Sequence, residues 1–173
     1  SKTHQFVLEG LFGKVYKAVT SKQLMKDKHI SDLKIQCLLL KYPEVERDSQ
    51  KKSTYKEEID FIVSHTKRNN FICNLALDQK GNTLILYNYV EKHGKVLMKL
   101  MENKSDKRDV FFIAGETDVE ERESIRAITE KCKDAIIIAS SGVLSTGVNI
   151  KNLQSLIFAH PYKAKIRNLQ IFV

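Results

Sequence analysis

The pattern of hydrophobic and polar positions becomes regular after Gly81. Short, mostly apolar runs of strand length alternate there with segments in which apolar residues recur at helical spacing. The runs cover 82–87, 110–114, 135–139 and 155–159. Continuous apolar runs are typical of strands that are buried on both faces, and these occur mainly in parallel sheets covered by helices. The alternation therefore predicts right-handed β-α-β units and an α/β fold.

Helices are predicted between these strands. Residues 91–101 have an amphipathic pattern, and the pair Thr117 and Glu120 forms a capping-box pattern at the start of a second helix. Residues 163–170 are expected to begin a further helix. The first two helices each link the end of one strand to the start of the next, as a parallel sheet requires.

The earlier residues are less regular. Residues 1–31 are interpreted as a lead-in segment, with a turn at 10–13 and a short helix after Thr20. Alternating positions predict a strand over 33–39, and the charged run 44–52 predicts a surface loop.

A longer helix is predicted to follow this loop. The pair Thr54 and Glu57 forms a capping box, and Val63 belongs to the apolar stripe behind it. Asn69 or Asn70 is expected to break or recap the helix, because asparagine favours helix ends over helix interiors.

Composition narrows the class of protein. The 173 residues suffice for one domain with a real core, and no apolar run has membrane-spanning length. Cys37, Cys73 and Cys132 lie on apolar stretches and contain no C-x-x-C pair, so we expect small buried thiols in a reducing compartment. These features predict a soluble cytoplasmic protein without a membrane partner.

The net charge of +8 is unevenly distributed. Six acidic residues gather in 116–130, whereas the rest of 81–173 carries twelve Lys and Arg against five acids. This distribution is consistent with a polyanion bound on one side of the domain. A well-solvated surface explains the same charge distribution, so the charge only adds support to other evidence for a bound polyanion.

The loop that follows 135–139 is the strongest candidate for a ligand site. It begins with Ser140, Ser141 and Gly142, and it stands where ligands gather in parallel sheets, beyond the carboxyl end of a strand. Glycine allows close backbone approach, and short hydroxyl side chains bind anionic oxygens.

The chain lacks the motifs of a self-sufficient enzyme. It contains no phosphate-binding loop of the type G-x-x-x-x-G-K-[S/T], no G-x-G-x-x-G and no G-x-S-x-G. Its histidines and cysteines have no metal-ligand spacing. No catalytic residue and no metal ligand is therefore predicted in this chain.

Four segments in fixed order carry a resemblance to a known family. They are 82–87, 112–117, 136–147 and 156–159. In this order they resemble the second RecA-like domain of superfamily 2 helicases, and within that group the UvsW helicases of T-even phages. The resemblance covers nearly the whole chain. It implies a RecA-like domain over 32–173, incomplete at its C-terminal end, with a mostly parallel sheet and helices on both faces.

The resemblance implies contacts with a nucleic-acid backbone. The positions are Tyr87, Asn88, Gly115, Thr117, Ser140, Ser141 and Gly142. For Gly115 and Thr117 the free N–H groups of a helix N-terminus would favour a phosphate. Two structural alternatives remain open: Tyr87 as a packing residue, and Thr117 as a helix cap, which is compatible with a phosphate contact.

The resemblance also implies nucleotide contacts at Gly147 and Asn149, across the cleft to another domain. Asn149 departs from the family pattern, which has an acid there, and closing a turn is its alternative role. The family's arginine finger, in G-R-x-x-R, does not appear after Gln170. Arg167 lies before that position. Arg122 resembles an arginine that recurs in this subgroup, but a surface ion pair with Glu121 or Glu123 is the favoured explanation.

The implied function is that of the C-terminal RecA-like half of an ATP-dependent DNA helicase or translocase that processes branched or recombination DNA. The implied partners are single-stranded or branched DNA and an N-terminal RecA-like domain, in the host cytoplasm if the protein is phage-encoded. ATP and Mg²⁺ would bind the full-length parent, and this chain alone is expected neither to bind them tightly nor to hydrolyse ATP. A stand-alone α/β module that binds nucleic acid or an anionic ligand is the main alternative, and an inactive gene product is another.

Overall fold

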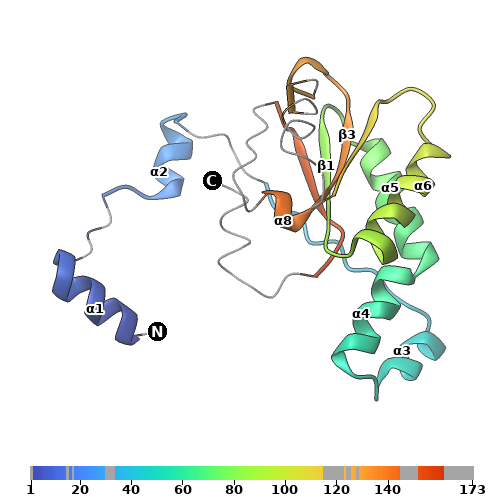
Figure 1. The fold of residues 1–173 in the computed structure, drawn as a ribbon, viewed down its shortest axis with the longest axis horizontal. Coiled ribbons are helices and arrows are strands. Elements are labelled where there is room, and N and C mark those ends of the chain that lie inside the picture. Colours follow the sequence, from blue (N-terminus) through green and yellow to red (C-terminus); the bar gives the residue numbers. More distant parts are fainter. Residues whose placement is uncertain are drawn as a thin grey trace. The chain divides into compact units, whose positions relative to one another are not determined.

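The computed structural model describes residues 2–14, 16, 18–29, 34–114, 123, 126–127, 129–144 and 152–161. The chain divides into two compact units, Ser1–Leu40 and Lys41–Val173 (Figure 1). The boundary between them follows Leu40, whereas the sequence placed the start of the RecA-like domain at residue 32. Among the described residues, no helix is long and apolar enough to cross a membrane, and no group of histidine, cysteine and acidic residues could hold a metal ion.

The described part of the first unit contains two helices, α1 (Lys2–Phe12) and α2 (Ser21–Lys26). Helix α1 continues through Gly10, so the turn predicted at 10–13 is wrong except at Gly13, which ends the helix with φ of 82°. Helix α2 begins as predicted, because the Thr20 side chain accepts a hydrogen bond from Gln23 N.

The strand predicted over 33–39 is wrong for its described part, 34–39, which has no regular structure. Ile35 and Leu39 are 68% and 91% exposed, and Cys37 is exposed rather than buried. Alternating polarity forms a strand only when a sheet edge supplies hydrogen-bond partners. The sheet of the second unit does not include this segment.

The charged run predicted as a loop forms a helix instead, α3 (Glu44–Gln50). Glu44 and Glu46 occupy its first turn, where negative charge interacts favourably with the helix dipole. An ion pair between Lys51 and Asp48 closes its last turn. The high density of charge therefore indicates correctly that this segment is exposed, but it does not indicate that the segment is a loop.

Helix α4 (Tyr55–Ser64) begins at the predicted capping box, in which Thr54 N donates to Glu57 Oε2 over 2.7 Å. The break before α5 (Thr66–Asp78) falls at His65, so the prediction of a break at Asn69 or Asn70 is wrong. Asn69 lies inside α5, fully buried, and its side chain donates to Val63 O, a carbonyl at the end of α4. The side-chain amide of Asn69, which belongs to α5, thus donates a hydrogen bond to one of the last carbonyls of α4, which have no partner within that helix.

Four parallel strands form the sheet of the second unit, in the order β2-β3-β1-β4. They are β1 (Thr83–Tyr87), β2 (Val110–Ile113), β3 (Ile136–Ser140) and β4 (Ser155–Phe158). Thr83 is aligned with Ile136 on one side and with Ser155 on the other. The predicted α/β class with a parallel, helix-flanked sheet is confirmed.

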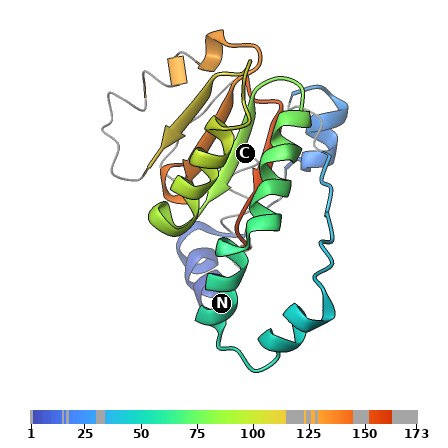
Figure 2. The same ribbon diagram turned by 90° about the vertical axis from the view of Figure 1, so that its right-hand side faces the viewer.

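Two helical segments follow β1, the π-helical turn η1 (Val90–Gly94) and α6 (Lys95–Glu102), so the helix predicted over 91–101 is confirmed. Helices α5 and α6 lie side by side on one face of the sheet (Figure 2), where Cys73 and Leu97 pack against Ile85. The opposite face is buried as well, with Leu84, Leu86 and Ile137 at most 1% exposed. Burial raises the pKa of the Cys73 thiol to about 11.

Two polar side chains fix the edge of the sheet at which the strands begin. Buried Asn82 donates to three carbonyls, those of Thr129, Cys132 and Asn152, and accepts from Ala135 N. Arg108, whose side chain is 8% exposed, donates to the carbonyls of Ala76, Gln79 and Gly81 and pairs with Asp134. These bonds satisfy backbone groups that the ends of α5, β1 and β3 leave unpaired.

Candidate nucleic-acid interface

The carboxyl ends of β1 and β3 bring two predicted contact segments together. Tyr87 and Ser140 are aligned across the ladder, so the residues that follow them are neighbours at the same edge. Ser141 Oγ donates a 3.0 Å hydrogen bond to Asn88 Oδ1. Asn88 is exposed, as is Gly142 in the short helix α8 (Ser141–Leu144). Three of the predicted residues therefore lie together at this edge, with Asn88 and Gly142 exposed and Ser141 buried beside them.

The serines contribute less surface than the sequence suggested. Ser140 is 6% exposed and Ser141 is 7% exposed. The hydroxyl of Ser141 orients the Asn88 amide, because the hydrogen bond engages the Oδ1 atom of that amide. Amide donors of this kind bind phosphate oxygens without reading the base sequence.

Tyr87 is a packing residue in the structure, the alternative that the sequence left open, and its buried side chain offers no surface for the predicted nucleic-acid contact. Its side chain is 0% exposed, and burial raises the pKa of its phenol. The hydroxyl donates to Ile113 O over 3.1 Å, and the ring stacks on Phe112 with centroids 5.5 Å apart. Gly94 lies directly against the ring, since a Cβ there would stand 2.5 Å from Tyr87 Cζ.

Four predicted contact residues lie outside the described residues: Gly115, Thr117, Gly147 and Asn149. The strand that precedes Gly115, β2, ends at the same edge of the sheet, because Ile113 is aligned with Ala139. The predicted helix after Thr117 is described only in part, with helical residues at 123, 126–127 and 129–131. The predicted helix at 163–170 and Arg122 also lie outside the described part.

Sequence reasoning missed a basic cluster beside this edge, composed of Arg68, His93 and His160. The Arg68 Nη2 donates to Ala159 O, at the end of β4, over 2.8 Å. His93 belongs to η1 and is 0% exposed, and His160 is 5% exposed. Burial, and after it the positive charge of Arg68, lowers the pKa of His93 to about 4. One signal was available: His160 directly follows an apolar run, at the strand end where ligand contacts are expected.

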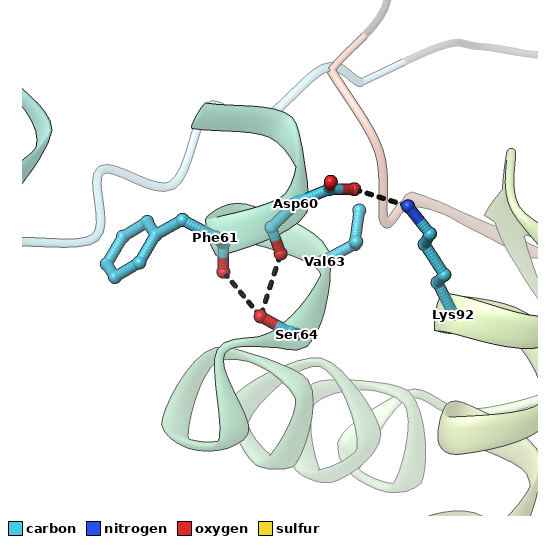
Figure 3. A pocket seen from close by; sticks show the side chains of 5 residues that line it. All are labelled: Asp60, Phe61, Val63, Ser64 and Lys92. Carbon is cyan, nitrogen blue, oxygen red and sulfur yellow. Dashed lines mark hydrogen bonds and ion pairs between the residues drawn. The ribbon is translucent and has the colours of Figure 1, made fainter. Parts of the chain in front are cut away.

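Aromatic and charged side chains continue from this cluster toward α4. The Tyr89 ring meets His160 edge-on at 5.4 Å, and Lys92 Nζ lies 5.9 Å from the centroid of Tyr89. Lys92 also pairs with Asp60 over 2.8 Å at the rim of a shallow pocket formed by α4 (Figure 3). Because the Asp60 carboxylate neutralises this lysine, the pocket itself is a poor site for an anion.

A helix-flanked parallel sheet with polar residues at its carboxyl edge is consistent with a RecA-like domain. The chain matches the family described as "Helicase conserved C-terminal domain" over residues 66–172, and it belongs to this family. It is 41% identical, over 164 residues, to the ATP-dependent DNA helicase uvsW of Enterobacteria phage T4. The alignment covers 93% of the chain and 32% of that relative, so the chain spans about a third of the length of the curated relative. The resemblance found in the sequence is confirmed.

Proposed function

We propose that this chain is the C-terminal RecA-like half of an ATP-dependent DNA helicase or translocase. Membership of the helicase family and the similarity to uvsW support the class. The proposed position of the DNA contact rests on the hydrogen bond between Ser141 and Asn88. It joins the ends of β1 and β3 and holds the exposed Asn88 at the edge where parallel sheets bind ligands.

In this function the domain binds the phosphate backbone of the DNA and does not contact the bases. Asn88 donates N–H groups to a phosphate oxygen, and Gly142 allows the strand to approach the backbone closely. Contacts of this kind suit a motor that must step along any sequence. The net charge of +8 adds a salt-dependent attraction to DNA.

ATP and Mg²⁺ belong to the whole motor in this proposal. Gly147 and Asn149 would contact a nucleotide held mainly by an N-terminal RecA-like domain, and closure of the two domains would couple hydrolysis to stepping. The proposed substrates are single-stranded and branched DNA, in the host cytoplasm if the gene belongs to a phage. This chain alone is proposed not to hydrolyse ATP.

Fluorescence anisotropy with labelled single-stranded and forked DNA, at about 50 and 200 mM salt, tests the placement. The informative variant is Asn88→Asp, which keeps an acceptor for Ser141 and places a negative charge at the proposed phosphate contact. Aspartates at Ser140 and Ser141 would instead bury a charge, since both side chains are buried. The matched control is Asn74→Asp, the same change at an exposed position of α5.

We expect salt-sensitive binding by the unmodified chain, at least tenfold weaker binding by Asn88→Asp, and little change in Asn74→Asp. Equal weakening by both variants would mean that only net charge matters, and the proposed contact would be rejected. Binding that neither variant changes would move the DNA site elsewhere and favour a non-motor module.

A further inference from the structure

The basic cluster of Arg68, His93 and His160 joins residues that are far apart in the sequence. Arg68 comes from α5, His93 from η1 after β1, and His160 directly follows β4. The bond from Arg68 to Ala159 O holds the guanidinium at the carboxyl end of β4. The charge of Arg68, second to burial, lowers the pKa of His93, and it also opposes protonation of His160. The three side chains thus act on one another at the ends of two adjacent strands.

Two members of the cluster hold buried polar atoms without a hydrogen-bond partner among the described residues. These atoms are Arg68 Nη1 and both ring nitrogens of His93. Leaving a buried donor or acceptor unpaired costs about 1–3 kcal/mol, and native structures contain few such groups. A fully buried imidazole beside an unsatisfied guanidinium N–H is therefore a costly arrangement for the domain alone.

Arg68 also lacks a counter-ion within the described part of the chain. No carboxylate there forms an ion pair with Arg68. Its interacting neighbour Tyr42 is a phenol whose pKa burial raises, so it is neutral near pH 7. Buried charges in proteins are ordinarily paired. The negative charge that would complete this arrangement is missing from the described residues.

We propose that Arg68, His93 and His160 form a binding site for a phosphate group at the carboxyl ends of β1 and β4. Guanidinium and imidazole N–H groups are strong donors to phosphate oxygens, and an anion would neutralise Arg68. The position is the edge at which parallel sheets bind ligands. The site uses none of the atoms of the Asn88–Ser141 pair. It does not rest on the proposed function, because the phosphate can belong to a nucleic acid or to a nucleotide.

The test is the protonation state of His93 in the 173-residue chain, observed by its ring ¹⁵N chemical shifts at pH 5.5. With chloride as the only anion, a pKa of about 4 leaves His93 only a few per cent protonated. A bound phosphate favours the imidazolium form, so inorganic phosphate at equal ionic strength is expected to protonate more than half of the His93 rings.

Two variants connect this response to the cluster. Arg68→Gln keeps an N–H donor for Ala159 O and removes the guanidinium, so the response to phosphate is expected to disappear. Lys67→Gln removes the same charge from the neighbouring exposed position of α5 and is expected to keep the response. If Arg68→Gln does not fold, the comparison of phosphate with chloride in the unmodified chain still decides the proposal.

An unchanged His93 spectrum at saturating phosphate overturns the proposal, and so does an equal response in folded Arg68→Gln. Parallel titrations with ATP and with an oligothymidylate identify the source of the phosphate. A response to ATP alone assigns the site to a nucleotide, and a response to the oligonucleotide alone assigns it to a DNA backbone.

Discussion

Replacing Gly94 with alanine tests whether Tyr87 is fixed in the core. The new Cβ would lie 2.5 Å from Tyr87 Cζ, about 1 Å inside a close carbon–carbon contact of ~3.5 Å. The ring cannot yield easily, because it is fully buried, stacked on Phe112 and hydrogen-bonded to Ile113 O. The clash must therefore displace the ring or the backbone of η1.

The expected loss of stability follows from three contributions. Overpacking a core costs about 1–3 kcal/mol. Breaking the bond from Tyr87 to Ile113 O leaves a buried acceptor and adds about 1–3 kcal/mol. Alanine returns up to ~1 kcal/mol as a better helix former than glycine. We expect Gly94→Ala to lower the free energy of unfolding by about 2–4 kcal/mol.

Urea unfolding followed by circular dichroism measures this loss, and Gly142→Ala is the matched control because a Cβ at Gly142 meets no atom within 4 Å. The control should unfold at nearly the same urea concentration as the unmodified chain. In the double variant Gly94→Ala with Tyr87→Leu, part of the loss should be recovered, because the ring is gone. An unfolding midpoint of Gly94→Ala equal to that of the control would refute the packing role assigned to Tyr87.

Three further outcomes are expected. Burial and the charges of Arg68 and His160 hold the pKa of His93 at about 4 against an ordinary 6.5, so the unfolded chain binds more protons between these pH values. The stabilising effect of neutral His93 should therefore be complete above pH 6.5, and the free energy of unfolding should fall by about 3 kcal/mol as the pH approaches 4. Urea unfolding in phosphate-free buffer measures this fall, which should be smaller in His93→Gln. Arg108→Ala should cost about 3–5 kcal/mol in thermal unfolding, because it leaves several carbonyls and Asp134 without their shared partner. Asn82→Ala should cost at least about 2 kcal/mol in the same assay, whereas a cost below ~0.5 kcal/mol would show that water replaces the amide.

The strands were predictable because their signal is local. Continuous apolar runs such as 135–139 identify strands buried on both faces, and the sheet confirms all four. The strand prediction for 33–39 failed because alternating polar and apolar residues indicate only that a segment could have one buried and one exposed face. A strand also requires the edge of a neighbouring strand to which its backbone can form hydrogen bonds. Helix α3 was not predicted because a high charge density indicates exposure and does not distinguish a loop from a helix, although the acids of its first turn favour a helix N-terminus.

The site was predictable only in outline. The strand-end rule and the family resemblance pointed to Asn88, Ser141 and Gly142, which the structure brings together at one edge and whose contact with DNA stays a prediction. The packing role of Tyr87 depended on its contact with Gly94, which sequence spacing does not reveal. The basic cluster joins positions 68, 93 and 160, which only the folded sheet brings together. Contacts of such long sequence separation leave no local pattern to find.

The most direct test of the central claim is a ¹H–¹⁵N correlation spectrum of the chain, titrated with single-stranded DNA at low salt. The carboxyl edge and the opposite edge of one sheet serve as site and internal control. We predict that the backbone amides of Asn88 and Gly142 shift with DNA concentration, while those of Gly81 and Asn82, where β1 begins, do not. Shifts concentrated at Gly81 and Asn82, or no shift at either edge, would contradict the placement of DNA on this domain.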